Sequence, residues 1–211
     1  MVGDGDIRSA NNTNVPRAGF IMVRGISYIN LKEDNEMIGI ILLGQSNSGK
    51  STIGKDVANK LDIRYISSGD IARSMNDVKV QESLMSGGLA PEDEMRNAVL
   101  SEINSSDVSY ILDGFPRFYE QYEWLNEHVG HDLVYIYLDA PRRDILIRAK
   151  SRGRYDDGSI EAKMKFFSEN TEPMIREIMN CGEDVHTINN GDGYVQDAMR
   201  EFINIVEGYL C

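Results

Sequence analysis

The sequence predicts an α/β fold of three layers, in which a five-stranded parallel sheet is covered by helices on both faces. Two observations lead to this class. Short apolar runs alternate along the chain with longer stretches of helical periodicity, which is the pattern of βαβ units. The first run, residues 38–43, is apolar at nearly every position, as expected of a strand that is buried on both faces.

Length and composition agree with one globular domain. The chain has 211 residues, of which 41% are hydrophobic and 27% are charged, so it is long enough to bury a substantial core. Its 34 acidic and 22 basic residues give a net charge of −12, which argues against a surface that attracts nucleic acid or anionic lipid throughout. No apolar run approaches the roughly 20 residues of a membrane span. We therefore expect no nucleic-acid partner, no membrane partner, and a monomer.

Residues 1–36 differ in composition from the rest of the chain. Their first half is rich in Gly, Asn and Asp and poor in large apolar residues, which is typical of disordered segments. We predict an extension over 1–36 and one domain over 37–211. The extension shows no basic stretch followed by an apolar core, so we expect no secretory signal and a cytoplasmic protein.

The expected elements alternate regularly from residue 37 onward. Strands are expected at 38–43, 63–67, 108–112, 133–138 and 185–188. Helices are expected at 50–61, 69–101, 118–128, 141–150, 159–179 and 195–209. The second helical region is expected to break at Gly87-Gly88 and to restart at Pro91, because proline suits the first turn of a helix and the acidic run 92–94 suits the positive end of its dipole.

A phosphate-binding loop follows the first expected strand. Residues 44–51 fit the pattern G-x-x-x-x-G-K-[ST], in which glycines let backbone N–H groups surround phosphate oxygens. Lys50 supplies a charge for the β- and γ-phosphates, and the Ser51 hydroxyl can help to hold Mg²⁺. The helix that begins here points its positive end at the phosphates. The candidate nucleotide-binding residues are Gly44, Asn47, Ser48, Gly49, Lys50, Ser51 and Thr52.

Three further segments carry a resemblance to a known family. Residues 66–73 read I-S-S-G-D-I-A-R, residues 88–94 read G-L-A-P-E-D-E, and residues 112–117 read L-D-G-F-P-R, with Gln121 four residues later. These segments resemble the motifs of the nucleoside monophosphate kinases, and of the adenylate kinase family most closely. The resemblance covers about residues 37–210. It implies a P-loop kinase fold with an acceptor-binding region near 67–96 and a lid near 148–157.

The resemblance implies transfer of the γ-phosphate of MgATP to a nucleoside monophosphate, with AMP favoured. Arginine forks suit the bidentate binding of a phosphate, and the Gln121 amide offers a donor and an acceptor to a base edge. The implied acceptor residues are Ser68, Gly69, Arg73, Ala90, Gly114, Arg117 and Gln121, and Asp113 is implied to order the water shell of Mg²⁺. For Ser68, the alternative is that its hydroxyl caps the following helix. A UMP/CMP-type kinase and a nucleotide-binding module without turnover remain alternatives for the whole chain.

Residues 148–157 resemble the lid of the short-form members, R-x-x-x-R-G-R-x-D-D. By resemblance Arg148 stacks on the ATP adenine, while Arg152 and Arg154 reach phosphates. Asp156 and Asp157 are expected to orient those arginines. The lid has no cysteine, so no zinc is expected. Gly193, or equally Gly191, is implied to approach the ATP base with its backbone. Within residues 142–154 the chain carries six basic residues and one acidic residue, a local basic site in an acidic protein.

The sequence departs from the family at two places. Lys163 falls where relatives carry an arginine, with Lys165 as a possible substitute, and lysine lacks the bidentate fork. Ser46 and Asn47 replace the usual Pro and Gly, and Ser51 replaces a Gly. Asparagine tolerates left-handed backbone, so the loop is still expected to form. The expected catalytic residues, which stabilise the transferring phosphoryl group, are Lys50, Arg117, Arg152, Arg154 and Lys163.

Overall fold

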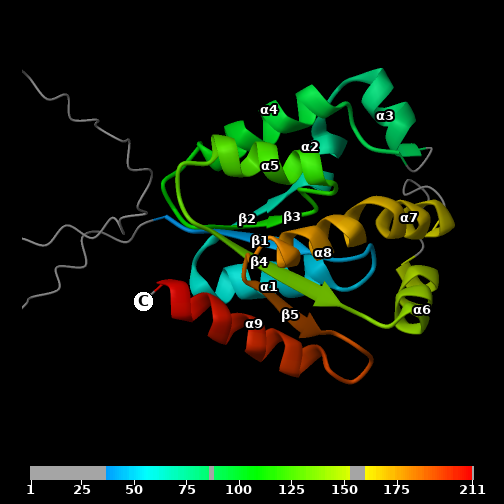
Figure 1. The fold of residues 1–211 in the computed structure, drawn as a ribbon. Helices are drawn as coiled ribbons and strands as arrows, with labels where there is room; N and C mark the ends of the chain where they lie inside the picture. The colour runs from blue at the N-terminus through cyan, green and yellow to red at the C-terminus, as the bar shows by residue number, and fades with distance from the viewer. Residues whose placement is uncertain (1–36, 86–87, 153–159, 211) are drawn as a thin grey trace, which may run out of the picture. The chain divides into compact units, whose positions relative to one another are not determined.

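The computed structural model describes residues 37–85, 88–152 and 160–210, so the predicted extension lies outside the described residues. The strands form one parallel sheet in the order β2-β3-β1-β4-β5, which confirms the predicted fold class (Figure 1). They are β1 (Gly39–Leu43), β2 (Arg64–Ser67), β3 (Tyr110–Asp113), β4 (Leu133–Asp139) and β5 (Val185–Asn189). Each begins and ends within two residues of its expected bounds.

The helices occupy the intervals between the strands. They are α1 (Lys50–Leu61), α2 (Ser68–Ser74), α3 (Val78–Met85), α4 (Glu92–Ile103), α5 (Tyr119–His128), α6 (Arg142–Arg152), α7 (Ile160–Phe166), α8 (Glu172–Asn180) and α9 (Val195–Leu210). A π-helical turn, η1 (Phe167–Thr171), joins α7 to α8. Within the described ranges, no helix combines the length and the apolar character that crossing a membrane requires.

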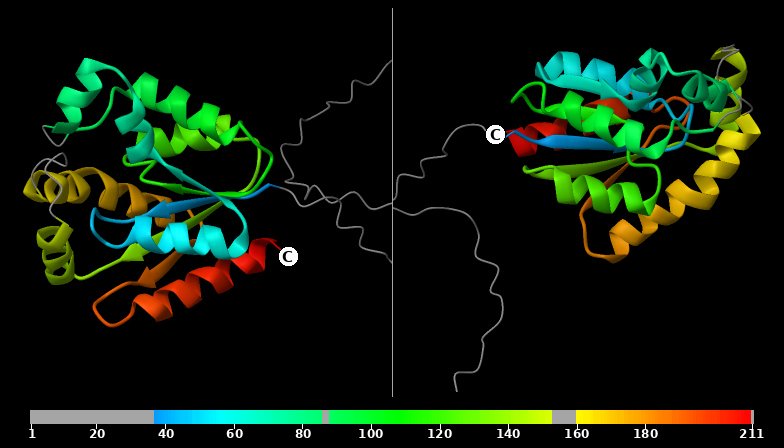
Figure 2. Two further views of the ribbon diagram at one scale, coloured as in Figure 1. Left: turned by 180° about the vertical axis from the view of Figure 1, so that it is seen from behind. Right: turned by 90° about the horizontal axis from the view of Figure 1, so that it is seen from above.

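Two hydrophobic clusters hold the layers together, one on each face of the sheet. Ile40 and Leu42 of β1 pack with α1 and α9, whereas Ile41 and Leu43 of the same strand pack with α4, α5 and α8. All five residues of β1 are buried. Figures 1 and 2 show the corresponding arrangement, with α1 and α9 on one side of the sheet and α4 and α5 on the other. This double burial explains why β1 is apolar at successive positions rather than at alternate ones.

The order of the strands places a crevice beside β1. The chain runs from β1 through α1 to β2 on one side, and from β3 through α5 to β4 on the other. Connections therefore diverge on either side of β1, and ligands of open α/β sheets bind at such a point, beyond the carboxyl ends of the strands. Figure 1 shows the strands pointing toward the side where α3, α6 and α7 lie.

The helical region expected at 69–101 has a break that the sequence analysis did not predict. The helix α2 ends at Ser74, and α3 begins after Asp77, whose Oδ1 accepts a hydrogen bond from the Val80 N–H at 3.2 Å. An aspartate in this position caps a new helix, and Gln81 Nε2 donates to the Met75 carbonyl at 2.9 Å. The segment is thus divided into α2, α3 and α4.

The helix expected at 159–179 contains the π turn η1. Pro173 has no N–H to donate to the preceding turn, and the Glu172 N–H bonds instead to the Phe167 carbonyl, five residues back. The Asn170 side chain donates to the Phe166 carbonyl at 3.0 Å, and this bond satisfies one further acceptor of the bulge. The bulge brings Thr171 to the cavity described below.

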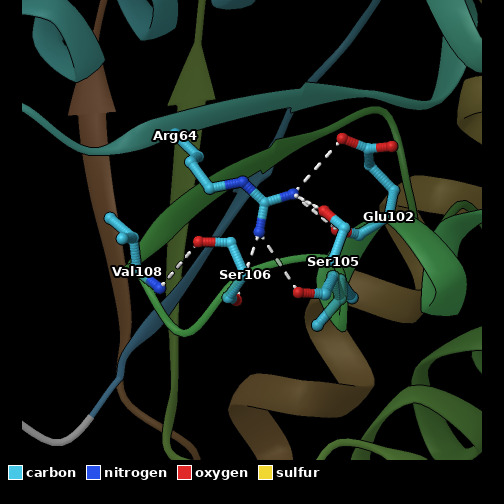
Figure 3. A network of polar contacts seen from close by, with 6 residues as sticks. Arg64, Glu102, Ser105, Ser106 and Val108 are labelled. Carbon is cyan, nitrogen blue, oxygen red and sulfur yellow. Dashed lines mark hydrogen bonds and ion pairs between the residues drawn. The ribbon is translucent and has the colours of Figure 1, made fainter.

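Arg64 ties β2 to the carboxyl end of α4 (Figure 3). Its Nη1 donates to the carbonyls of Ile103 and Ser106 at 3.2 and 3.4 Å. Its Nη2 donates to the Glu102 carbonyl, to Ser105 Oγ at 2.8 Å and to Glu102 Oε1 at 3.2 Å. One guanidinium thus satisfies several carbonyls that the end of a helix leaves without partners, and its charge complements the helix dipole.

Replacing Arg64 by methionine should lower the free energy of unfolding by about 2–3 kcal/mol, because several hydrogen bonds to a charged group are lost together. Urea denaturation measures the change. Arg200→Met is the matched control, since Arg200 lies on the surface of α9 and pairs there with Asp197. Equal stability of Arg64→Met and the control would contradict the structural role assigned to Arg64.

Candidate active site

The loop between β1 and α1 has the backbone of a phosphate-binding loop. Gly44 and Gly49 have φ values of 142° and 101°, and Asn47 has φ of 65°, the left-handed conformation that asparagine tolerates. A Cβ at Gly44 would lie 2.5 Å from the Leu138 carbonyl oxygen, so this position also requires glycine for close approach. The prediction that the loop forms despite Asn47 is confirmed.

A cavity of about 480 Å³ opens beside this loop at the carboxyl end of the sheet. Its walls come from the loop itself, from α2, from the segment after β3, from α6 and from the turn between α7 and α8. The cavity brings together most residues that the sequence analysis singled out. They are Gly44, Asn47, Gly49, Lys50, Ser51, Thr52, Gly69, Arg73, Asp113, Gly114, Arg117, Arg148 and Lys163.

Other predicted residues lie outside the cavity wall. Four of them are buried and do not line the cavity, namely Ser48, Ser68, Ala90 and Gln121, and Gly193 stands in an exposed turn. The structure also answers the alternative for Ser68: the side chain that caps α2 is that of Ser67, which accepts from the Asp70 N–H. Arg152 ends α6, whereas Arg154, Asp156 and Asp157 lie outside the described residues.

Lys50 lies against the loop from which it projects. Its Nζ donates to the carbonyls of Gly44 and Gln45 at 2.8 and 2.9 Å. These contacts hold the ammonium group at the mouth of the loop, where the N-terminus of α1 adds its partial positive charge. The loop and Lys50 together form an anion-binding concavity.

Asp113 receives two hydroxyl hydrogen bonds on one oxygen. Ser51 Oγ donates to its Oδ2 at 2.7 Å, and the Tyr65 hydroxyl donates to the same atom at 2.5 Å. Burial, together with the nearby Asp113 carboxylate, raises the pKa of Tyr65 well above its ordinary range, so this hydroxyl keeps its proton and remains a donor. Tyr65 was not singled out from the sequence, where it is one residue of a short strand.

Arg148 joins the phosphate loop to the segment that follows β5. Its Nη1 donates to the Ser48 carbonyl at 3.1 Å, and its Nη2 donates to the Asn190 carbonyl at 2.8 Å. The buried Asn190 side chain donates to the same Ser48 carbonyl at 2.6 Å. A Cβ at Gly49 would collide with Asn190 Nδ2, so the glycine also permits this close contact. Asn190 is a second residue that sequence reasoning missed, and no local motif marks it.

Arg73, which lines the same cavity from α2, is oriented by Asp70. Arg73 Nη2 lies 2.6 Å from Asp70 Oδ1, and Lys55 Nζ lies 3.7 Å from Asp70 Oδ2. Partial burial acts to raise the pKa of Asp70, but its bonds to Arg73 and the charge of Lys55 outweigh burial and lower that pKa. Asp70 therefore stays ionised at neutral pH and holds the guanidinium.

Hydrogen bonds hold both the side chain and the backbone of Arg117. Its Nε donates to the Gly114 carbonyl at 2.7 Å, its N–H donates to Gln121 Oε1 at 2.8 Å, and its carbonyl accepts from Thr171 Oγ1 at 2.7 Å. The peptide bond before Pro116 is cis. These contacts place the guanidinium at the cavity wall with little freedom to move away.

The structure separates the two lysines that the sequence left as alternatives. Lys163 lines the cavity, whereas Lys165 lies on the surface and pairs with Glu169 at 3.8 Å. The cavity is thus lined by the side chains of Lys50, Arg73, Arg117, Arg148 and Lys163. A set of cations around a phosphate loop, with a carboxylate at the end of the neighbouring strand, defines a P-loop phosphotransferase.

Comparison with known proteins gives the family. A family model described as an AAA domain matches residues 43–163. An adenylate kinase of Corynebacterium diphtheriae is 30% identical over 172 residues, which cover 75% of this chain and 93% of that protein. Adenylate kinase 1 of a Nostoc species is 33% identical over 180 residues, covering 78% and 96%. An adenylate kinase of Rickettsia bellii is 32% identical over 176 residues, covering 79% and 80%.

The chain belongs to the adenylate kinase family, and its class is nucleoside monophosphate kinase. The resemblance that its motifs indicated is confirmed.

Proposed function

We propose that the protein catalyses the reaction MgATP + AMP ⇌ 2 ADP. The observation that carries this proposal is the placement of two phosphate-binding groups in one cavity: the loop with Lys50 after β1, and Arg73 in α2 together with Arg117 after β3. The relatives named above are adenylate kinases, which supports AMP as the acceptor. The Gln121 amide, which suits an adenine edge, supports the same choice.

Phosphoryl transfer of this kind depends on positioning and on charge. The loop and Lys50 would hold the β- and γ-phosphates of ATP, while Arg73 and Arg117 would hold the phosphate of AMP beside them. Arg117 and Lys163 would then balance the charge that is shared by the attacking and leaving oxygens. On the resemblance of the lid motif alone, we add Arg152 and Arg154 to this set. Direct transfer requires no phosphorylated residue of the chain.

The Ser51 and Asp113 side chains fit a Mg²⁺ ion that accompanies ATP. Both present oxygen atoms beside the phosphate loop, and hard oxygen donors are what Mg²⁺ prefers. When bound, the ion would neutralise charge on the phosphates. The role of the chain is to keep the two oxygens in place, and the hydrogen bond from the Tyr65 hydroxyl to Asp113 supports this.

Replacing Tyr65 by phenylalanine should raise the Mg²⁺ concentration that gives half-maximal rate by about tenfold, because Asp113 loses a hydrogen bond that orients it. A Mg²⁺ titration at saturating nucleotide measures this. Tyr194→Phe is the matched control, since Tyr194 is exposed. If both variants show the same Mg²⁺ requirement as the unmodified chain, Tyr65 does not orient Asp113.

The proposed function is tested with the purified chain and MgATP, offered AMP, GMP, UMP and CMP in parallel. We expect nucleoside diphosphate to form fastest with AMP, and Lys50→Met to lower that rate to near background. Faster reaction with UMP or CMP would replace AMP by a pyrimidine acceptor. Tight binding of ATP without turnover on any acceptor would show instead a binding module, the reading that Lys163 and the altered loop leave open.

A further inference from the structure

We propose that Glu92 is a positioning residue that fixes the orientation of the Gln121 amide, and that it thereby selects bases with an exocyclic amino group over bases with an oxo group. The inference rests on the proposed function in one respect, namely that Gln121 reads the acceptor base. It adds a residue to that function and a chemical criterion for the substrate.

A continuous series of hydrogen bonds runs through Gln121. Its Nε2 donates to Glu92 Oε2 at 2.8 Å, and its Oε1 accepts from the Arg117 backbone N–H at 2.8 Å. On the far side, Glu92 Oε1 accepts from Arg96 Nε. The series therefore begins at a guanidinium N–H and ends at a backbone N–H.

Both ends of the series are hydrogen-bond donors. This fixes which atoms of Glu92 and Gln121 donate and which accept. Arg96 and the Arg117 N–H each require an acceptor. A carboxylate at position 92 offers two acceptors, one to Arg96 and one to the amide, so Gln121 must present its NH₂ to Glu92 and its oxygen to Arg117. The opposite orientation of the amide would set an oxygen against the carboxylate and an NH₂ against the Arg117 N–H.

Neither end of the series is free to turn away. Arg96 stacks over the Trp124 ring, with its Cζ 5.5 Å from the ring centroid, and also donates to the Glu120 carbonyl. The Arg117 N–H belongs to a residue whose backbone carbonyl accepts from Thr171 Oγ1 and whose side-chain Nε donates to the Gly114 carbonyl. Gln121 itself is only 3% exposed, so water does not offer its amide substitute partners. A reversed amide would leave buried polar groups unsatisfied.

The protein uses one N–H and one lone pair of the Gln121 amide. On the proposed function, the second N–H and the second lone pair are those that meet the acceptor base when it binds, and they do so in a fixed order. Along its pairing edge, adenine presents a ring acceptor and then an amino donor, whereas hypoxanthine and guanine present a ring donor and then an oxo acceptor. Cytosine, like adenine, presents a ring acceptor and an amino donor, whereas uracil presents a ring donor and an oxo acceptor. An amide that cannot reverse matches one order only, because ribose and phosphate fix the base relative to the protein. The criterion is the exocyclic group and not the size of the ring.

Replacing Glu92 by glutamine removes the cause of the fixed Gln121 orientation while the volume of the side chain stays nearly the same. Two amides between two donors supply two oxygens and two NH₂ groups, so one contact in the series must be lost whichever way they turn. Both orientations of Gln121 then have similar energies. Glu94→Gln is the matched control, because it makes the same change on the same turn of α4 at an exposed side chain.

The experiment compares kcat/KM for AMP and for IMP, which differ at the exocyclic group that the inference concerns. We expect Glu92→Gln to reduce the AMP-to-IMP ratio by at least about tenfold, a change of roughly 1.4 kcal/mol in discrimination, through KM of the monophosphate and with KM of ATP unchanged. Glu94→Gln should keep the ratio of the unmodified chain. An unchanged ratio in Glu92→Gln overturns the inference and leaves the proposed function standing.

Failure of the proposed function is recognised separately. If the chain prefers a pyrimidine acceptor, the same comparison is made with CMP and UMP, and the same loss of discrimination is expected. If no acceptor reacts, the side-chain NH₂ resonances of Gln121 are compared by NMR in the unmodified chain and in Glu92→Gln. A single environment that becomes shifted or doubled in the variant supports a fixed amide, and identical spectra overturn it.

Discussion

Lys50→Met should lower kcat/KM for phosphoryl transfer by about 10³-fold or more, in line with the loss of a group that stabilises developing charge at the transferred phosphate. The ammonium group is held at the mouth of the loop by the Gly44 and Gln45 carbonyls, and a methionine of similar length fills the space without the charge. Steady-state kinetics with MgATP and AMP measure the loss. Because methionine keeps nearly the same side-chain length at this position beside the cavity, the unfolding midpoint should change little.

Lys60→Met is the matched control for that experiment. Lys60 lies in the last turn of the same helix, α1, at the end opposite the loop. It should retain the rate of the unmodified chain. A Lys50→Met variant that keeps more than a tenth of the activity would show that the loop backbone alone supplies the charge stabilisation, and would remove Lys50 from the catalytic set.

Arg117→Lys should reduce kcat/KM by about 10²-fold or more, because lysine keeps the charge but loses the planar fork that binds phosphate through two N–H groups. The backbone contacts of residue 117 do not depend on the side chain, so the Gln121 and Thr171 bonds should persist. The loss should fall on kcat and on KM of the monophosphate, with KM of ATP nearly unchanged.

Arg200→Lys provides the comparison for Arg117→Lys, since Arg200 forms an exposed ion pair on α9. Equal rates in the two variants would mean that a single positive charge suffices at position 117. A rise in KM of ATP alone would place Arg117 on the donor side of the cavity, contrary to the proposed function.

The fold could be predicted because its determinants are local or periodic. The continuous apolar run of β1, the glycines of the loop and the alternation of strands with helices each follow from a few neighbouring residues. Helix α1 has the expected bounds because Gly49 begins it and Asp62, in left-handed conformation, ends it. The two helices whose interruptions were not predicted also have local causes. A capping aspartate at residue 77 divides the first, and a proline at residue 173 introduces a π turn in the second.

The candidate site was predicted only as far as motifs extend. Lys50, Arg73 and Arg117 stand in recognisable patterns, whereas Tyr65 and Asn190 stand in none. Glu92 lies in the segment 88–94, but its contact with Gln121 joins residues that are distant in the chain. Tyr65 reaches Asp113 because β2 pairs with β3 in a register that sets Ser67 beside Asp113. Asn190 reaches the phosphate loop across 142 residues. Such contacts depend on strand order and helix packing, which a single sequence does not display.

The two ends of α4 have a mechanical consequence for the acceptor side of the cavity. At its carboxyl end the helix is tied to β2 by Arg64, and at its amino end Glu92 is tied through Gln121 to the backbone after β3. Contacts at both ends of α4 oppose rotation of the helix about either end. If the acceptor side widens to admit a monophosphate, we therefore expect the displacement in α2 and α3, which precede Pro91, and not in α4.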